Sequence, residues 1–377
     1  MVRPKVPSAQ LLGPAAPSSQ YPSSALSFLN KKVTKFAQDF KDAGDQIKKW
    51  RAQLNTIKAD MTTAQATGTA GAPRITAEVP PHLLRLARAR LDQALAVGNE
   101  GAGTVVATGD GDMAKALMGQ RVACVPGTAY SQYAIADASM CLPLGDHSAE
   151  DGASSFVNPM TALGFAENAK MDGQEAILHT VGASNLGQML VKICQEDGLG
   201  LVNIVRKSDQ VDLLKDLGAK HIVNSADGDF MDQLKSAIDE TNAFYGFDPI
   251  GGGKMVDSCF KAMEQVASKK MSEYSRYGSN QQKRMFIYGR LDMGPTTLTP
   301  SYGFGWTLSG WLLTPFLQMA GGETVARMRK RVLDNLTTTF ASSYKSKVDL
   351  EGMLTKEAIL DYRQMKTGEK YLVMPNG

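Results

Sequence analysis

The feature that most constrains the fold is a regular alternation of strand and helix patterns between residues 175 and 288. Short runs of apolar and β-branched residues predict strands, and the longer amphipathic stretches between them predict helices. Strands connected through helices pair in parallel, and the helices cover both faces of the sheet. The fold class that we predict is therefore α/β, with a doubly wound parallel sheet. The predicted strands are 175–181, 201–205, 221–224, 243–248 and 284–288, and the predicted helices are 186–197, 209–217, 230–240 and 255–266.

The first of these strands runs directly into a glycine-rich turn, Gly182-Ala-Ser-Asn-Leu-Gly187, and a helix pattern begins at once. Glycines between a strand and a helix let the backbone approach a pyrophosphate, which then lies at the positive end of the helix dipole. Ser184 stands where the GxGxxG pattern has its middle glycine, so the string alone is a weak match. The strand–turn–helix context nevertheless favours a Rossmann nucleotide-binding domain over an ordinary tight turn.

The residues after the second strand favour NADPH over NADH. An NAD site carries an acidic side chain here, which binds the ribose hydroxyls. This chain instead has Val205-Arg206-Lys207-Ser208. Arg206 offers a planar fork that suits a 2′-phosphate, and Lys207 adds a second positive charge. The alternative is a solvated basic turn without a ligand.

Composition narrows the class of protein further. The chain has 377 residues, enough for two domains with a core each. Its net charge of +3 gives no indication of nucleic-acid binding, and no apolar run is long enough to span a bilayer. The cysteines and histidines are dispersed, which predicts that the cysteines are small buried hydrophobic residues in a reducing compartment and form no disulfide framework, that the histidines are packed, and that there is no metal site. The most apolar stretch, 308–320, contains Pro315 and is predicted to be a buried helix or an interface segment.

The N-terminal region has a different pattern. Residues 1–24 are rich in Pro and Ser, and the first acidic residue is Asp39, which is typical of an organelle transit segment or of a disordered tail. Apolar residues then recur at alternating steps of four and three from Leu29 to Met61, the spacing of a long amphipathic helix that packs on another helix. That helix either docks on its own domain or binds a helical protein partner, with a membrane surface as the third alternative. Residues 62–73 are predicted to form a linker.

From residue 97 the pattern changes to short β runs with glycines between them. These runs predict strands of a small antiparallel barrel at 103–109, 121–125 and 132–136. The tail from Thr337 returns to short mixed elements.

Seven motifs follow one another along the chain: Gly98-Asn-Glu-Gly-Ala-Gly-Thr-Val-Val, Gly119-Gln-Arg-Val-Ala, Asn158-Pro-Met-Thr-Ala-Leu-Gly, the glycine-rich turn, Leu217-Gly-Ala-Lys-His-Ile, Phe247-Asp-Pro-Ile-Gly-Gly and Tyr288-Gly. In this order they resemble the medium-chain dehydrogenase/reductases, and among them the zinc-free quinone oxidoreductases and enoyl reductases. The resemblance covers residues 63 to 377.

The resemblance implies a partial GroES-like β-barrel beside the Rossmann domain, a cofactor in the cleft between them, and a homodimer formed through the Rossmann domain. The implied division is 1–62 for the tail and helix, 63–157 for the GroES-like domain, completed by 330–377, and 158–329 for the NADP-binding domain.

The resemblance also implies a set of cofactor-binding residues. Asn99 stands where the zinc enzymes carry a histidine, so no catalytic zinc is implied. Hydride transfer in the zinc-free branch instead relies on positioning and on polarisation of a carbonyl or an activated alkene. The implied residues are Asn158 and Thr161 at the domain junction, Gly182, Ser184, Asn185, Leu186 and Gly187 at the pyrophosphate, Arg206 and Lys207 at the adenosine phosphate, and Ile250, Gly251, Tyr288 and Gly289 at the strand ends.

The chain departs from the family pattern near its N-terminus. The region before Ala72 contains little strand pattern, so the opening barrel strands are expected to be missing, with the heptad helix inserted into what remains. No early residue matches the tyrosine that enoyl reductases use as proton donor, and Tyr21 is not proposed for that role. The catalytic residue is therefore unassigned. Arg290 follows Tyr288-Gly289 where a smaller residue is usual, and it either crowds the cofactor cleft or forms a salt bridge.

Three functions remain open on this basis. The first is a zinc-independent, NADPH-dependent reductase of quinones, enals or enoyl thioesters. The second is a degenerate reductase that serves as a structural or accessory subunit of a larger assembly, mitochondrial or from another organelle, through its N-terminal helix. The third is a redox-sensing subunit that binds NADPH without turnover. The expected compartment is the cytoplasm or an organellar matrix.

Overall fold

The computed structural model describes residues 60–69, 72–78, 97–362, 364 and 370–376. The Pro/Ser-rich tail and all but the last two residues of the predicted heptad helix lie outside the described residues. Met61, the last residue of that apolar stripe, belongs to a strand, so the helix does not extend as far as predicted.

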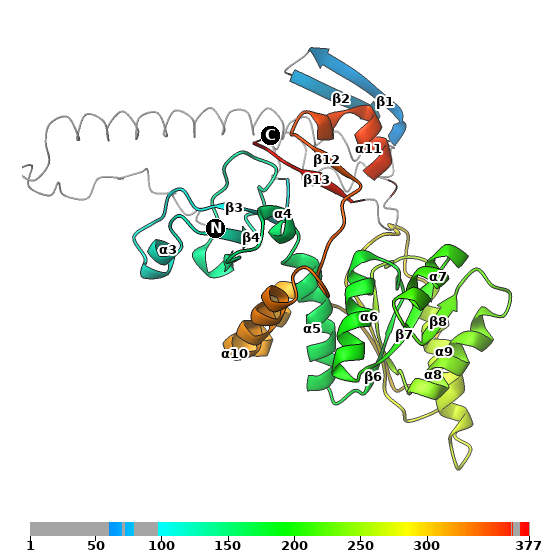
Figure 1. Ribbon diagram of the computed structural model, residues 1–377. Coiled ribbons are helices and arrows are strands. Elements are labelled where there is room, and N and C mark those ends of the chain that lie inside the picture. The colour runs from blue at the N-terminus through cyan, green and yellow to red at the C-terminus, as the bar shows by residue number, and fades with distance from the viewer. Residues whose placement is uncertain (1–59, 70–71, 79–96, 363, 365–369, 377) are drawn as a thin grey trace, which may run out of the picture.

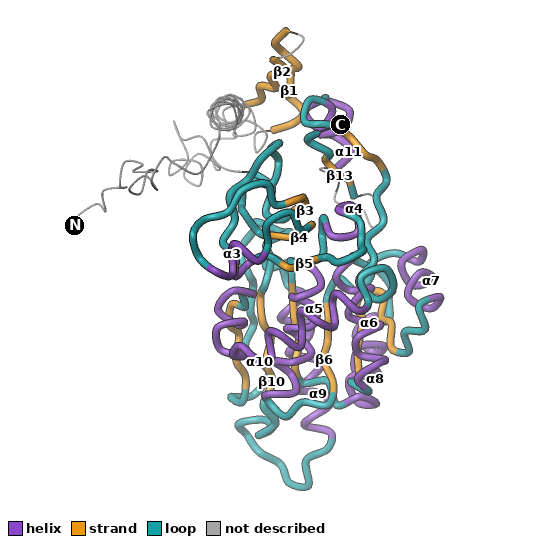
Figure 2. The backbone as a smooth tube through the Cα atoms, turned by 60° about the vertical axis from the view of Figure 1, so that its left-hand side comes forward, coloured by secondary structure: helices purple, strands orange, loops and turns teal. Residues whose placement is uncertain are grey.

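A six-stranded parallel sheet forms the centre of the molecule (Figures 1 and 2). Its first strand in the sequence, β6, lies in the middle, and the chain builds outward first through β7 and β8 and then through β9, β10 and β11. This is the doubly wound order of a Rossmann fold, and it confirms the predicted fold class. The strands are β6 (Ala176–His179), β7 (Gly200–Val205), β8 (His221–Asn224), β9 (Tyr245–Asp248), β10 (Lys283–Ile287) and β11 (Trp306–Gly310).

Helices cover both faces of this sheet, as the alternating sequence pattern predicted. One apolar core joins the sheet to α5, α6, α7 and α10, and the other joins it to α8 and α9. Because the central strands are buried on both faces, they read as continuous apolar runs rather than as alternating ones. The helices are α5 (Val157–Met171), α6 (Asn185–Asp197), α7 (Ser208–Asp216), α8 (Phe230–Thr241), α9 (Met255–Lys269) and α10 (Leu313–Asp334).

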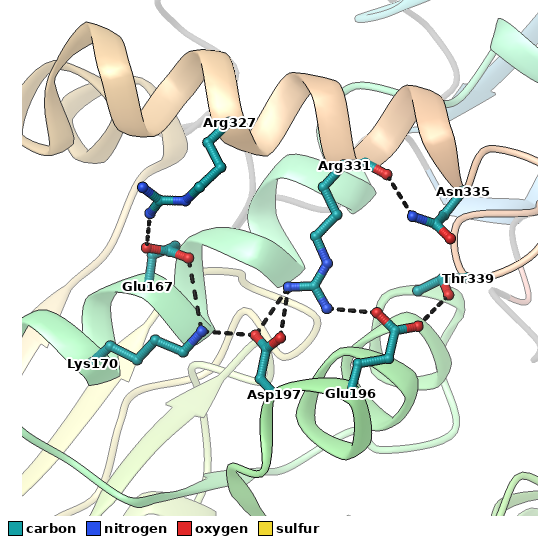
Figure 3. A network of polar contacts seen from close by, with 8 residues as sticks. All are labelled: Glu167, Lys170, Glu196, Asp197, Arg327, Arg331, Asn335 and Thr339. Atoms are coloured by element: carbon teal, nitrogen blue, oxygen red, sulfur yellow. Dashed lines mark hydrogen bonds and ion pairs between the residues drawn. The ribbon is translucent and has the colours of Figure 1, made fainter.

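A charged network holds α10 across α5 and α6 (Figure 3). Arg331 bridges Glu196 at 2.6 Å and Asp197 at 2.9 Å, while Arg327 reaches Glu167 at 2.6 Å. Burial raises the pKa of Asp197, but hydrogen bonds from Arg331 and Lys170 outweigh that effect and hold the pKa below its ordinary value. The network therefore fixes α10 against the two helices that carry predicted site residues.

Three smaller sheets lie outside the six-stranded sheet (Figure 1). β3 (Gly101–Thr104), β4 (Arg121–Cys124) and β5 (Leu142–Pro143) are antiparallel, and β12 (Ser346–Val348) pairs in parallel with β13 (Tyr371–Val373). The described residues contain no closed barrel. The short helices are α3 (Asp112–Ala116), η2 (Ala138–Met140), α4 (Ala149–Gly152), η3 (Gly352–Leu354) and α11 (Lys356–Tyr362), so the tail has the mixed short elements that the sequence predicted.

The predicted linker at 62–73 is wrong. β1 (Asp60–Thr69) and β2 (Ala72–Glu78) pair there as antiparallel strands, with a register shift between Asp60 and Gln65. The glycines and alanines of this stretch are typical of a linker, but the threonines among them favour extended backbone.

Two of the predicted barrel strands also need correction. The run 132–136 forms no strand, and the side chain of Ile135 is 74% exposed. An alternating run becomes a stable strand only where a neighbouring strand and a covering layer bury its apolar face, and none of the described strands pairs with it. The predicted strand at 103–109 ends at Thr104, which pairs with Arg121, the first residue of its antiparallel partner β4.

The apolar stretch 308–320 is not the single buried helix that was one of its two predicted forms. It comprises the end of β11, which pairs with β10, and the start of α10. Pro315 occupies the first turn of α10, where its missing N–H would have no acceptor within the helix, so the helix continues past it.

Candidate functional site

The predicted site residues converge on one edge of the central sheet. Most of them follow the carboxyl ends of β6, β7, β9 and β10, which are neighbouring strands. α5 leads into β6 through a short connection and runs antiparallel to it, so the first turn of α5 reaches the same edge (Figure 1). The chain reverses its winding direction between β6 and β9, and ligands of doubly wound sheets bind in the crevice at that point.

The two glycines of the turn between β6 and α6 are required by the packing around them. A Cβ at Gly187 would lie 2.1 Å from the carbonyl oxygen of Gly182, and a Cβ at Gly182 would lie 2.8 Å from the Cβ of Asn203. Both distances are far shorter than a van der Waals contact. The start of α6 therefore packs against the backbone that leaves β6, which is the close approach that a pyrophosphate-binding turn needs.

The N-terminus of α6 presents donors to this turn. Ser184 is the N-cap residue, and its hydroxyl accepts a hydrogen bond of 3.0 Å from the backbone N–H of Gly187. The other amides of a helix's first turn have no acceptor within the helix, and together with the helix dipole they form an anion site. The side-chain amide of Asn185 donates at 3.2 Å to the hydroxyl of Ser342, so the C-terminal segment contacts the turn. Leu186 points into the core.

A buried amide without a hydrogen-bond partner lies behind the turn. Asn203, on β7, is only 1% exposed, yet neither its side-chain nitrogen nor its side-chain oxygen has a partner among the described residues. Its side chain lies against Gly182. Buried polar groups normally have hydrogen-bond partners. The two unpaired side-chain atoms of Asn203, beside the turn that Gly182 and Gly187 form, therefore fit a site in which a bound polar ligand supplies the missing partners.

Arg206 and Lys207 directly follow β7, and both side chains are exposed. The backbone N–H of Arg206 donates to the side-chain oxygen of Gln210 at 3.1 Å, which orders the turn into α7. Neither basic side chain forms an ion pair within the described ranges. Two positive charges therefore remain available at the strand end where a dinucleotide's adenosine would lie.

The ends of β9 and β10 touch at two glycines. A Cβ at Gly251 would lie 2.8 Å from the carbonyl oxygen of Gly289, and a Cβ at Gly289 would lie equally close to that of Pro249. Asp248 organises this corner, because its carboxylate accepts hydrogen bonds from the Gly251 N–H at 2.8 Å and from the Thr180 hydroxyl. Burial raises the pKa of Asp248, and these hydrogen bonds oppose that rise. Ile250, which directly precedes Gly251, is half-buried.

Tyr288 turns its hydroxyl into the protein. The oxygen lies 2.7 Å from Nε2 of His179 on β6, and burial raises the pKa of Tyr288 well above its ordinary value. His179 is fully buried, which lowers its pKa to about 3 and keeps the ring neutral. We therefore assign the pair to fixing the ends of β6 and β10 and not to proton transfer. Arg290, two residues further on, is exposed and forms no ion pair with a described residue.

The first turn of α5 carries Asn158 and Thr161, and hydrogen bonds to Glu100, the residue directly before β3, hold its start in place. One carboxylate oxygen of Glu100 accepts hydrogen bonds from the backbone N–H groups of Phe156 and Val157, at 3.0 and 2.8 Å. Burial raises the pKa of Glu100, although both hydrogen bonds oppose the shift. Thr161 is 6% exposed and Asn158 half-buried. Glu100 therefore connects the small sheet to the junction helix.

Several of these residues were not singled out from the sequence. Glu100 and Asp248 lie inside quoted motifs, so their positions could have been marked, but their hydrogen bonds depend on folding. His179 was correctly interpreted as a packed histidine. Asn203 gave no signal, because an amide in an apolar run reads as an ordinary strand residue.

Three comparisons with known proteins agree with this geometry. A family model described as zinc-binding dehydrogenase matches residues 185–267. The mitochondrial enoyl-[acyl-carrier-protein] reductase of Bos taurus is 28% identical over 133 residues, 33% of this chain and 36% of that protein. A crystal structure described as an NADPH:quinone reductase from Mesorhizobium loti is 28% identical with a TM-score of 0.62, over 73% of this chain and 76% of that one. In sequence and in fold the chain is similar to the medium-chain dehydrogenase/reductases.

The recognition made from the motifs is thereby confirmed, and it points to the quinone and enoyl reductase branch. A mycobacterial member of this fold, solved in complex with NADPH, aligns with a TM-score of 0.59 and 18% identity over 83% of this chain and 89% of that one. The match to the bovine enzyme spans about a third of that enzyme's length. Within the described ranges of the chain, no three His, Cys, Asp or Glu side chains are arranged to hold a metal ion. Asn99 is exposed. Among the same residues, no helix is both long and apolar enough to span a bilayer.

Proposed function

We propose that this chain is a zinc-independent oxidoreductase that uses NADPH to reduce a quinone, an enal or an enoyl thioester. The observation that carries the proposal is the glycine cradle at Gly182 and Gly187 with the exposed guanidinium of Arg206 at the next strand end. The bovine relative is an enoyl reductase and the Mesorhizobium relative is described as a quinone reductase, which supports the reaction class. The reductase activity is proposed for the chain as a whole.

The roles that we propose for the site residues follow from their places. The Gly182–Gly187 turn and the first amides of α6 bind the pyrophosphate, with Ser184 and Asn185 ordering the turn and Leu186 anchoring it in the core. Arg206 binds the 2′-phosphate through its planar fork, and Lys207 contributes charge. Asn158, Thr161, Ile250, Gly251, Tyr288 and Gly289 line the nicotinamide half of the crevice.

When bound, NADPH supplies the hydride for the carbonyl or alkene carbon. The contribution of the chain is to position the reactants and to limit access of water. Phe165, Phe247 and Trp311 pack together with ring centroids 3.9 to 6.2 Å apart, which joins α5, β9 and the end of β11 in one apolar cluster. A Cβ at Gly164 would lie 3.0 Å from the Trp311 ring, so α5 packs directly on this cluster. The proton donor stays unassigned, because the Tyr288 hydroxyl faces His179.

Oxidation of NADPH in the presence of candidate acceptors tests the proposed activity. Purified full-length chain is expected to oxidise NADPH with at least one member of a panel of quinones, enals and enoyl thioesters, followed by the fall in NADPH absorbance. Arg206→Ala should raise the KM for NADPH about 10- to 100-fold, the loss expected for a charge-assisted phosphate contact. Lys215→Ala, which removes an exposed positive charge from the other end of α7, is the matched control and should change nothing. Binding of NADPH without turnover on any acceptor would contradict the activity and favour a redox-sensing subunit.

The accessory-subunit hypothesis receives less support than the reductase. It depends on the heptad helix, which lies outside the described residues, and we do not propose it. The division into domains and the homodimer through the Rossmann domain stay proposals, and sedimentation of the purified chain tests the homodimer. The mitochondrial relative is what favours an organellar matrix among the expected compartments.

A further inference from the structure

Two of the dispersed cysteines face each other across the small antiparallel sheet. β4 and β5 pair Val122 with Pro143 and Ala123 with Leu142. Continuing this register by one residue places Cys124 directly opposite Cys141. Residues that are directly opposite in an antiparallel ladder point to the same face of the sheet. The sequence did not indicate this pair, because its members are separated by a long loop.

The hydrogen-bond pattern shows which kind of pair this is. The N–H of Leu144 donates to the carbonyl oxygen of Arg121 at 2.9 Å, and such pairs alternate along an antiparallel ladder with pairs that exchange no hydrogen bond. Val122 and Pro143 form the next, non-hydrogen-bonded pair, which suits the missing N–H of proline. Two steps further, Cys124 and Cys141 are again non-hydrogen-bonded, and the Cys141 N–H instead donates to Ala138 at 3.2 Å.

That geometry favours a disulfide. The Cα atoms of a non-hydrogen-bonded pair in a regular antiparallel ladder are about 4.5 Å apart, and disulfides bridge Cα separations of about 4.4–6.8 Å. Both cysteines are only partly buried, so a bridge between them would be open to exchange with thiols in solution.

The surroundings distinguish the two thiols. Burial and the neighbouring Cys141 raise the pKa of Cys124 to about 11. Burial and Asp137 also raise the pKa of Cys141, but the positive charge of Arg329 opposes the rise. The Nε of Arg329 is buried and has no hydrogen-bond partner in the described part of the chain. Cys141 therefore has the more accessible thiolate. Both thiols are partly exposed, whereas Cys194 and Cys259 are buried in the Rossmann domain.

We propose that Cys124 and Cys141 are a reversible dithiol–disulfide site that exchanges with low-molecular-weight disulfides. The Cys141 thiolate attacks one sulfur of the small disulfide, which releases one small thiolate and leaves a mixed disulfide on Cys141. Cys124 then loses its proton and attacks the sulfur of Cys141, releasing the second small thiol. Two protein thiols are oxidised and one small disulfide is reduced to two thiols, so electrons and atoms balance.

The test equilibrates the full-length chain with mixtures of reduced and oxidised glutathione and quenches with acid. The proposal expects a loss of two hydrogen masses and a peptide cross-link between Cys124 and Cys141, both reversed by reduced glutathione. Adducts on single cysteines without the cross-link, or free thiols at every glutathione ratio, would overturn it. The readout involves neither NADPH nor turnover, so it stands or falls separately from the proposed function.

Serine variants test the order of attack. Cys124→Ser should stop the exchange at a stable glutathione adduct on Cys141, because no resolving thiol remains. In Cys141→Ser, glutathione should modify Cys124 more slowly than it modifies Cys141 in the Cys124→Ser variant. Burial raises the pKa of Cys124, whereas the positive charge of Arg329 favours the thiolate of Cys141. Cys259→Ala is the matched control, and it should cross-link like the unmodified chain. Equal rates of adduct formation in the two serine variants would contradict the assignment of Cys141 as the attacking thiol.

Discussion

Gly187→Ala is expected to lower the free energy of unfolding by about 1–3 kcal/mol, the range for overpacking in a filled interior, and to abolish tight NADPH binding. Alanine is favoured over glycine within a helix by about 1 kcal/mol, so propensity alone predicts a gain. The added Cβ, however, would lie 2.1 Å from a backbone oxygen and 2.6 Å from a backbone carbon of Gly182. Backbone atoms at that distance cannot rotate away, so α6 has to shift away from β6. The shift opens the cradle that we assign to the pyrophosphate.

Chemical denaturation and NADPH titration of the same preparation measure the two effects of this substitution. The matched control is Gly228→Ala, at an exposed glycine where a Cβ would meet nothing within 4 Å. The control should leave the stability unchanged or raise it by up to about 1 kcal/mol, because it restricts only the unfolded chain. If Gly187→Ala behaves like Gly228→Ala, the close approach of α6 to β6 does not exist.

Lys283→Met is expected to cost about 3–5 kcal/mol of stability, the usual loss when one partner of a buried ion pair is removed. Lys283 is fully buried at the start of β10, and its ammonium contacts Glu264 at 2.7 Å, Gln281 at 2.7 Å and Ser279 at 3.0 Å. Methionine matches the length of lysine but leaves the Glu264 carboxylate buried without its counter-ion. Adding Glu264→Gln to Lys283→Met removes that charge, and the double variant should recover part of the loss.

The loss should also depend on pH. Burial raises the pKa of Glu264, but Lys283 and Ser279 outweigh this and hold it below its ordinary value. The ion pair therefore stabilises the unmodified chain above the unfolded pKa of glutamate, and this contribution disappears as pH falls through the folded pKa. In Lys283→Met the unpaired carboxylate is destabilising at neutral pH and harmless once protonated. Denaturation at pH 7 and at mildly acidic pH should show that the difference in free energy of unfolding between the unmodified chain and Lys283→Met becomes smaller at the lower pH. A gap that is constant with pH would contradict a charge-based origin.

The sequence predicted the Rossmann half closely because each of its signals is local. Glycine punctuation and apolar runs such as 221–224 define buried strands without reference to the rest of the chain, and β8 matches that run residue for residue. The glycine turn was recognised for the same reason, since Gly182 and Gly187 belong to adjacent elements. Where all the residues of a binding turn are close together in the sequence, the sequence of that turn is enough to identify them.

The parts that were mispredicted depend on distant contacts. β11 becomes a strand only because β10 lies beside it, and the run at 132–136 stays irregular because no described strand pairs with it. Glu100 binds a helix that starts 57 residues later in the chain. The pairing of Cys124 with Cys141 likewise depends on the β4–β5 register. None of these contacts has a spacing that a single sequence can show.

Direct titration of the full-length chain with NADPH and with NADH is the measurement that tests the nucleotide site most directly. The account predicts that NADPH binds at least about tenfold more tightly, because Arg206 makes charge-assisted contacts that only the 2′-phosphate provides. Arg206→Ala should remove this preference by weakening NADPH and leaving NADH unchanged, whereas Lys215→Ala should preserve it. Equal affinities for the two nucleotides, or an NADPH affinity that survives Arg206→Ala, would contradict the account.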